Sequence, residues 1–267
     1  MKLNELRNRI IELLENINEE EYPQIVRTLK CYVDVAEECA YNLFSDLFDS
    51  DQTKVLPYNV SDFMIELASL LIDEECYDAA CTLGALYYKG RFGKVDYIKA
   101  VHYYKLAADN GVRQAQENLG YCYYYGRDVE IDYEKAFHYF SLGAFDGHIN
   151  SLYKIGDMYR NGYYVEKNPV EAYRIYRRCL DTLTDEAVPY VGADVMFRMG
   201  DCYFEGIGTE VDLNEAYAFY HNAEILYYQR LLEGDFLIKG CYKKVVDRQE
   251  EIRNKRNSEI PGYEWVK

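Results

Sequence analysis

The sequence repeats one eight-residue frame, and this repetition limits the folds open to the chain more than any other feature. The frame is Leu-Gly-x-x-Tyr-x-x-Gly, which reads LGALYYKG from Leu83 and LGYCYYYG from Leu119. The Leu-Gly pair or a close variant begins at positions 83, 119, 155 and 199, in steps of 36, 36 and 44 residues. Five further positions recur at the same steps with identical or similar residues, and we call each such set of equivalent positions a column. In the first copy they are Tyr87, Gly90, Asp96, Ala100 and Tyr104. Such a register over four copies is typical of a repeat protein.

Each copy is predicted to form two antiparallel helices. Apolar residues from Ala79 to Lys89 have helical spacing, and Gly90 fits the end of that helix. Asp96 fits the N-cap of a second helix over Tyr97–Asp109. A hairpin of this size cannot bury its apolar face alone, so successive hairpins stack into one continuous core. The sequence therefore predicts an all-α solenoid, an α-α superhelix with clear repeats that start near 77, 113, 149 and 193.

The segments outside the clear repeats also have helical patterns. We expect a short helix over residues 3–17, a longer one from Pro23 to Phe48, and a helix capped by Ser61. A last helix covers roughly Asp235 to Arg256, and the eight extra residues before the fourth copy predict a longer loop or an extended helix end. The predicted division of the chain is N-terminal capping helices over 1–60, the repeat array over 61–233, and a C-terminal capping helix and tail over 234–267.

Composition narrows the classes of partner. The 267 residues carry a formal net charge of -16, which disfavours nucleic acid and favours a protein or peptide with basic residues. The run between Lys239 and Arg256 holds seven basic and three acidic residues, and we interpret it as a solvated helix face. No apolar stretch approaches the roughly 18 residues of a membrane span, so no membrane association is predicted. With no apolar leader at the N-terminus, the eight cysteines are expected to be reduced, in the cytoplasm.

The residues that follow the frame match a known pattern. A polar Asp, then Lys-Ala and an aromatic pair, as in ALYYKGRFGKVDYIKAVHYYKLAADNG, resembles the Sel-one-like repeat, a relative of the tetratricopeptide repeat. The fourth copy adds the family's Gly-x-Gly at Gly206-Ile207-Gly208. The resemblance covers residues 77 to about 225 and implies a right-handed α-solenoid whose members mostly act as adaptors that hold other proteins.

The same resemblance implies where a partner binds. In tetratricopeptide-like solenoids the first helix of each hairpin lines the concave face, and positions -6, -3, +1 and +4 from the Leu-Gly glycine share the stripe opposite the frame's Leu and Tyr. We expect an acidic and aromatic groove in which Glu117, Asp157 and Asp201 receive Lys or Arg of the partner. The candidate groove residues are Tyr88, Gln114, Glu117, Tyr121, Tyr124, Asn150, Tyr153, Asp157, Arg160, Phe197, Asp201 and Phe204. The pattern equally fits ordinary solvated or repeat-packing residues, and both interpretations stay open.

Motifs that carry chemistry are missing from the sequence. GRFGKVD from Gly90 lacks the spacing of a phosphate loop, and His102 and His138 share one column without further ligands for zinc. We therefore predict a non-catalytic protein without cofactor, metal or catalytic residues; the alternative is a hydrolase or metal-dependent enzyme that uses the same groove. The sequence leaves two further questions open: whether the chain forms a homodimer through the end helices, and whether the tail around Trp265 occupies a groove or is disordered.

Overall fold

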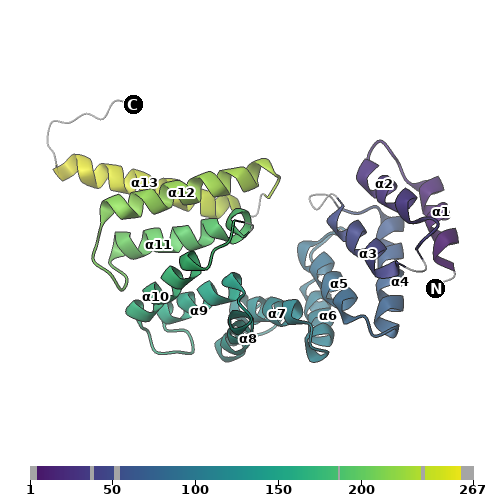
Figure 1. Ribbon diagram of the computed structural model, residues 1–267, viewed down its shortest axis with the longest axis horizontal. Coiled ribbons are helices and arrows are strands. Elements are labelled where there is room, and N and C mark those ends of the chain that lie inside the picture. The colour runs from purple at the N-terminus through teal and green to yellow at the C-terminus, as the bar shows by residue number, and fades with distance from the viewer. Residues whose placement is uncertain (1–4, 37–38, 51–54, 186, 236–237, 260–267) are drawn as a thin grey trace. The chain divides into compact units, whose positions relative to one another are not determined.

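The computed structural model describes residues 5–36, 39–50, 55–185, 187–235 and 238–259, and within these ranges the chain is all-helical without a strand. Two compact units make up the chain, residues 1–139 and 140–267 (Figure 1). The boundary between them falls within helix α8 (Tyr133–Phe145). We describe each unit by itself.

Unit 1 contains the N-terminal helices and the first clear repeats. Its helices are α1 (Leu6–Asn16), α2 (Pro23–Tyr32), α3 (Ala40–Asp49), α4 (Tyr58–Asp73), α5 (Tyr77–Lys89), α6 (Tyr97–Asp109), α7 (Arg113–Tyr125) and the start of α8. Adjacent helices from α1 to α7 pack against each other along this order, and the contact between α5 and α6 is the most extensive of these. The short first helix and both helices of the first repeat were predicted within a few residues of these bounds.

Two predictions about unit 1 are wrong. The single helix expected from Pro23 to Phe48 is two helices that pack against each other. In one straight helix the same buried residues, 18 positions apart, would lie about 27 Å apart along the axis and could not pack together. The Tyr32 hydroxyl joins them by donating to Asp46 Oδ2 at 2.6 Å. Ser61 does not cap a helix: α4 starts three residues earlier, directly after Pro57, and the buried Ser61 hydroxyl donates to the Leu56 carbonyl.

Unit 2 contains the later repeats and the C-terminal helix. Its helices are the rest of α8, α9 (Ile149–Asn161), α10 (Pro169–Asp181), the π-helix η2 (Val188–Gly192), α11 (Ala193–Glu205), α12 (Leu213–Leu232) and α13 (Lys239–Glu259). The extra residues before the fourth copy begin with non-helical residues after the end of α10 and end in η2, which runs directly into α11. The insertion therefore combines the two expectations, a longer loop and an extended helix end. The predicted tail around Trp265 lies outside the described residues.

Glycines end the first helix of each clear repeat. Gly90, Gly126, Gly162 and Gly206 all have φ between 66° and 76°, a left-handed conformation that side chains with a Cβ rarely adopt. The next helix then begins with a side-chain cap, as when Asp96 accepts a hydrogen bond from the Lys99 amide at 3.0 Å. These local signals set the hairpin boundaries that the sequence predicted.

A second kind of glycine brings the two helices of a hairpin together. A Cβ on Gly200 would lie 2.6 Å from the ring of Tyr220, and a Cβ on Gly156 would lie 2.6 Å from the ring of Tyr176. The glycine column therefore exists because the aromatic ring of the second helix lies directly on the backbone of the first. Any larger residue would push the two helices apart.

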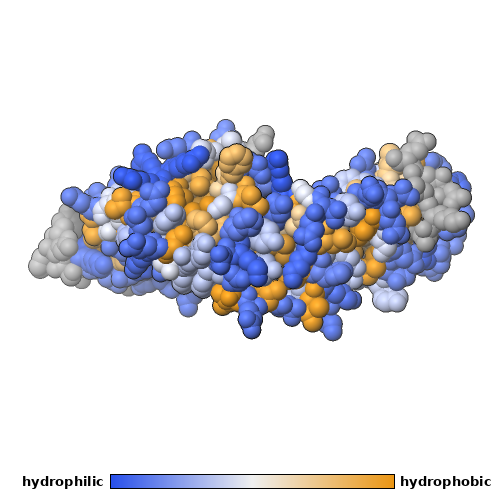
Figure 2. Space-filling model, turned by 90° about the horizontal axis from the view of Figure 1, so that it is seen from below, coloured by the Kyte–Doolittle hydropathy of each residue, from blue (hydrophilic) through white to orange (hydrophobic). Residues whose placement is uncertain are grey.

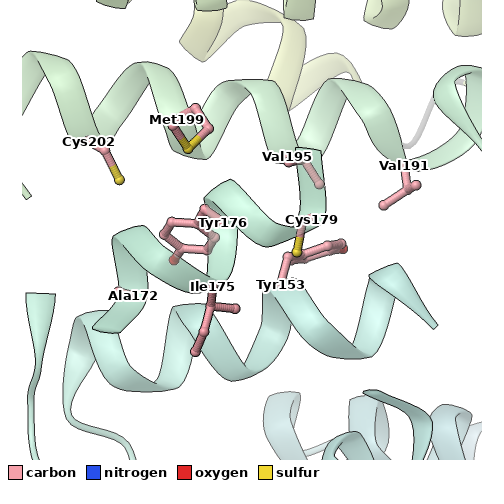
Figure 3. Packing of buried hydrophobic residues seen from close by; sticks show 9 residues of the cluster. All are labelled: Tyr153, Ala172, Ile175, Tyr176, Cys179, Val191, Val195, Met199 and Cys202. Atoms are coloured by element: carbon pink, nitrogen blue, oxygen red, sulfur yellow. The ribbon is translucent and has the colours of Figure 1, made fainter. Parts of the chain in front are cut away.

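The core of unit 2 is continuous across neighbouring repeats. Nine buried residues from α9, α10, η2 and α11 pack into one cluster, which includes Tyr176, Cys179 and Met199 (Figure 3). Cys202 in this cluster and Cys122 in unit 1 are fully enclosed, and burial raises the pKa of both thiols to about 12. This confirms the prediction that these cysteines act as small core hydrophobes.

One face of the molecule is mostly polar. The face shown in Figure 2 carries mainly hydrophilic residues, with hydrophobic residues in small separate groups. Single exposed apolar side chains do occur, such as Phe145, which is 92% exposed. Among the described residues, no helix has the length and apolar content that crossing a membrane requires.

Candidate partner-binding surface

The candidate groove residues of unit 1 lie on α5 and α7. Gln114 is exposed, and Tyr88, Tyr121 and Tyr124 are half-buried, so part of each aromatic ring stays open to solvent. Glu117 is only 3% exposed. Its burial takes the carboxylate away from the surface that a partner can touch, which corrects its expected role as an acceptor for a basic side chain.

The half-buried tyrosines pack against other aromatic rings. The Tyr88 ring lies 5.1 Å from that of Tyr97, and the Tyr124 ring meets Tyr125 and Tyr133 edge-on at 4.8 and 5.7 Å. Such pairs fix the orientation of the rings, so little conformational entropy is left to lose when a partner binds. Unit 1 therefore presents a preformed aromatic surface.

The candidate groove residues of unit 2 lie on α9 and α11 and divide by exposure. Asn150 is exposed, while Arg160 and Phe197 are partly exposed. The others are buried, at 5 to 6% exposure: Tyr153, Asp157, Asp201 and Phe204. Some residues of the predicted stripe are therefore on the open surface, and others are buried between the repeats. The buried carboxylates among them need hydrogen-bond partners inside the unit.

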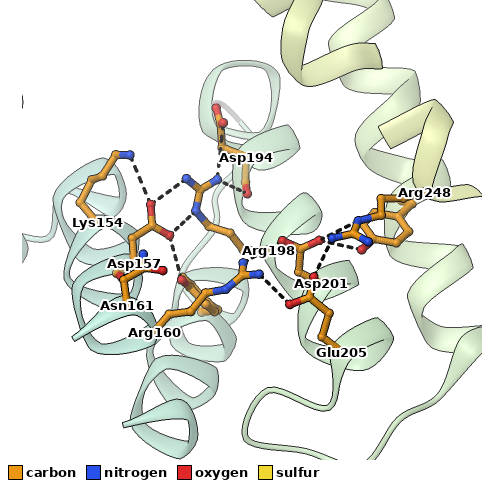
Figure 4. A network of polar contacts seen from close by, with 11 residues as sticks. Lys154, Asp157, Arg160, Asn161, Asp194, Arg198, Asp201, Glu205 and Arg248 are labelled. Carbon is orange, nitrogen blue, oxygen red and sulfur yellow. Dashed lines mark hydrogen bonds and ion pairs between the residues drawn. The ribbon is translucent and has the colours of Figure 1, made fainter. Parts of the chain in front are cut away.

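Asp157 has such partners from three directions (Figure 4). Arg198 binds it with two hydrogen bonds, from Nε to Oδ1 at 2.6 Å and from Nη2 to Oδ2 at 2.8 Å. Lys154 Nζ lies 3.2 Å from Oδ2, and the Tyr176 hydroxyl donates to Oδ1 at 2.8 Å. A paired arginine fork of this kind is the strongest geometry for a carboxylate in a protein.

Asp201, at the equivalent position of the next repeat, is held in a similar way. Arg160 Nη1 donates to Oδ2 at 2.7 Å, the Tyr220 hydroxyl donates to Oδ1 at 2.7 Å, and Arg248 of α13 lies 3.9 Å from Oδ1. The two repeats thus exchange arginines, since Arg198 of the fourth repeat binds Asp157 and Arg160 of the third binds Asp201 (Figure 4). We call these two contacts the crossed ion pairs.

The pKa values follow from burial and pairing. Burial of the Asp157 carboxyl works to raise its pKa, but Arg198 and Lys154 outweigh this effect and hold the pKa at about 2. Burial and then Asp157 raise the pKa of the Tyr176 hydroxyl well above its usual range. Asp157 is therefore ionised and Tyr176 protonated at neutral pH, as the hydrogen bond between them requires.

Two open pockets lie beside the crossed ion pairs. One of about 210 Å³ is lined by residues of α9 and α11, and one of about 410 Å³ is lined by α11 and α13. Both pockets share Phe197 and Asp201. Their charged side chains include arginines and a lysine as well as carboxylates, so the surface is of mixed charge rather than acidic. Phe197 is the aromatic side chain that stands between them.

Several basic side chains of α13 contact other helices of unit 2. Arg248 Nη2 donates to Glu205 at 2.6 Å, Lys255 Nζ lies 4.1 Å from the centre of the Phe204 ring, and Arg256 donates to the Leu213 carbonyl. These contacts hold the helix against α11 and α12. They are consistent with its interpretation as a helix face that offsets the acidic body.

The described residues contain no group of three or more His, Cys, Asp or Glu side chains that could hold a metal ion. His102 and His138 each lie edge-on to the tyrosine that follows, with ring centroids 5.1 and 5.5 Å apart. Both histidines are therefore engaged in local aromatic contacts.

Comparison with protein families settles the nature of the repeat. The Sel1 repeat model matches four segments of the sequence, residues 78–112, 113–148, 149–178 and 193–224. The chain is a Sel1-like repeat protein. Proteins built from Sel1 repeats are generally protein-interaction modules and typically non-catalytic scaffolds.

Solved structures share the fold of this Sel1-like repeat protein. A Sel1 repeat protein from Oxalobacter formigenes is 17% identical, with a TM-score of 0.56 over 87% of this chain and 93% of that one. A protective antigen of uropathogenic Escherichia coli with an SLR fold is 18% identical, with a TM-score of 0.51 over 95% of this chain, which spans 57% of that antigen. Both support an α-solenoid. No curated protein matches the sequence.

Three cations beside Asp157 and Asp201 in the Sel1-like repeat protein were not predicted: Lys154, Arg198 and Arg248. Alignment of the repeats could have indicated the first two, because Lys154 and Arg198 are both basic and occupy the same repeat position, two residues before the glycine. A second signal is a correlation between two repeat positions, one and twenty residues after the glycine. The third and fourth repeats have Asp at the first and Tyr at the second, as Asp157 with Tyr176 and Asp201 with Tyr220, whereas the second repeat has Tyr121 with Phe140. Arg248 lies outside the repeats and has no such signal.

Proposed function

We propose that this Sel1-like repeat protein is a non-catalytic adaptor that binds a peptide or protein partner along the stripe formed by the first helices of its repeats. The observation that carries the proposal is a set of partly exposed aromatic side chains at stripe positions that the repeat frame does not need. These are Tyr88, Tyr121 and Tyr124 in unit 1 and Phe197 in unit 2. Rigid aromatic rings are the side chains that most often dominate the energy of a protein interface.

The surroundings of Phe197 support this role. The two pockets that share Phe197 leave room beside the ring for side chains of a partner. The buried carboxylates nearby, Asp157 and Asp201, are paired within the unit, so a partner that covers them does not have to neutralise an isolated buried charge. A bound segment would therefore gain apolar contact with the ring at a low cost in desolvation.

The net charge supports a partner with basic residues. A chain of net charge -16 attracts basic proteins over a distance and speeds their encounter, and this effect weakens as salt is added. Since Asp157 and Asp201 are occupied by arginines of the chain, we assign the attraction to the whole acidic surface and the specific contacts to the aromatic stripe.

Affinity purification with mass spectrometry tests the proposal. The full-length protein is compared with its Phe197→Ala and Tyr124→Ala variants, and Phe145→Ala serves as the control because that ring is 92% exposed on α8. We expect the stripe variants to lose a partner that the wild-type protein and the control retain. The lost partner should carry basic residues and elute at moderate salt.

Equal recovery of every partner by all four proteins would contradict the proposal. Light scattering on the same samples measures self-association through the end helices, which we propose as a secondary interaction. The alternative function is a hydrolase or metal-dependent enzyme that uses the same groove.

A further inference from the structure

Arg127, which follows α7 in unit 1, is a half-buried cation set among tyrosines. Its guanidinium carbon lies 5.1 Å from the centre of the Tyr97 ring and 5.8 Å from that of Tyr125. The hydroxyl of Tyr88 lies close enough to interact with it. Within the part of the chain that the structure describes, no carboxylate lies at ion-pair distance from it.

The absence of an acidic partner is unusual in this chain. Asp and Glu outnumber Lys and Arg by 46 to 30, and Arg160, Arg198 and Arg248 are each bound to carboxylates. Arg127 instead has aromatic rings beside it and one hydroxyl, and its buried Nε has no hydrogen-bond acceptor in the described structure. A guanidinium has five N–H donors, and within this part of the structure no protein acceptor is present for the buried one on Nε.

The first repeat shows what an arginine at this position binds when oxygen atoms are present. Arg91 occupies the same repeat column as Arg127, one residue after the glycine that ends the first helix. Its Nη atoms reach the Phe48 and Ser50 carbonyls, at 3.5 and 3.2 Å. These oxygens belong to the end of α3, which lacks the left-handed glycine that closes α5. Arg127 therefore occupies the repeat position at which Arg91 binds backbone carbonyl oxygens, but it has no such oxygens beside it.

We propose that Arg127 and the tyrosines around it bind a carboxylate group of the protein partner, supplied by an Asp or Glu side chain. One guanidinium matches one negative charge, and its paired N–H groups fit the two oxygens of a carboxylate. Tyr97 and Tyr125 hold the guanidinium in place, and Tyr88, Tyr121 and Tyr124 extend the contact surface beside it. The inference rests on the proposed function, since it names the chemistry recognised at one place on the stripe.

The test is a nuclear magnetic resonance titration of the full-length protein with assigned backbone amides and labelled arginine Nε groups. The probes are the peptide acetyl-Gly-Glu-Gly-amide, its Gln counterpart and inorganic phosphate, in about 0.15 M salt so that the net charge is screened beyond about 8 Å. We expect the Glu peptide to shift the Arg127 Nε and Gly126 amide signals saturably, with a dissociation constant in the millimolar range. The Gln peptide should leave them unchanged.

Two variants and a matched control complete the test. Arg127→Lys keeps the charge and loses the paired donors, so its affinity for the Glu peptide should fall about tenfold, which corresponds to about 1.4 kcal/mol. Tyr97→Leu removes one ring and should weaken binding without touching the guanidinium. Arg178→Gln removes a positive charge from an exposed position of α10 and should bind like the wild-type protein.

Three results would overturn the inference: no saturable shift at Arg127 in the wild-type protein, equal affinity in Arg127→Lys, or a response to phosphate alone. The first is decisive whether or not the variants fold. A negative titration leaves the affinity purification with Phe197→Ala unaffected, so failure of this inference and failure of the proposed function can be told apart.

Discussion

Replacing Arg198 with Met gives the sharpest test of the crossed ion pairs. The substitution removes both hydrogen bonds to Asp157 and leaves a carboxylate that is 9% exposed with Lys154 and Tyr176 as its remaining partners. Removing one partner of a buried pair typically costs about 3–5 kcal/mol. Because Lys154 stays 3.2 Å away, we expect about 3 kcal/mol for Arg198→Met. The double variant Asp157→Asn, Arg198→Met should lose less, since it leaves no unpaired carboxylate.

The pH dependence of the same variant follows from linkage. In the wild-type protein the pKa of Asp157 is held at about 2, below the value of about 3.9 in an unfolded chain. This depression contributes about 2–3 kcal/mol, which is fully present above about pH 4 and is lost as the pH falls toward 2. Arg198→Met loses most of the depression. The difference in stability between the two proteins should therefore narrow between about pH 4 and pH 2.

Hydrogen exchange provides the assay, because repeat proteins often open one part at a time and a single melting temperature averages over these events. The opening free energy is measured at amides of α9 and α11 in the wild-type protein and both variants. Amides of α5 in unit 1 are the internal control and should not change. A loss below about 1 kcal/mol, a double variant less stable than the single one, or a difference that does not vary with pH would refute the role of the pair.

Three further predictions concern packing and burial. Gly200→Ala should destabilise unit 2 by about 1–3 kcal/mol in thermal unfolding, because the added Cβ would lie 2.6 Å from the ring of Tyr220. Gly240→Ala is the control and should be neutral or slightly stabilising, because no atom lies within 4 Å of its added Cβ. Tyr220→Phe should cost about 2 kcal/mol by leaving Asp201 without a 2.7 Å hydrogen bond, and an unchanged urea midpoint would count against that bond. In a thiol-modification time course, the exposed Cys31 should react in the folded protein and the buried Cys202 only after unfolding, because burial raises the pKa of Cys202 to about 12.

The repeat architecture could be predicted in detail because its signals are local. The helix over Tyr97–Asp109, its cap at Asp96 and the glycine at Gly90 depend on residues within a few positions of each other, and the structure has the same boundaries. The family comparison and the structure agree with this part of the sequence analysis. The break between α2 and α3 could not be predicted in this way, because the apolar period continues across it.

The chemistry of the stripe was harder to predict because it depends on tertiary contacts. Helical geometry places Asp157 and Asp201 on the first-helix stripe, but it does not say which cation reaches them. Their arginine partners come from the neighbouring repeat and from α13, and are 41 residues or more away in the sequence. A count of acidic residues on the stripe therefore overestimates the negative charge that a partner meets, because arginines at nearby repeat positions neutralise part of it.

Photo-crosslinking at single positions tests the central claim, partner binding along the aromatic stripe, most directly. A photoreactive phenylalanine analogue is introduced at Phe197 or Tyr124, and at the exposed Phe145 as the reference position. The account predicts that irradiation in the native cell joins the same partner protein to positions 197 and 124 and not to position 145. Adducts at position 145 alone, or a partner that joins neither stripe position, would contradict it.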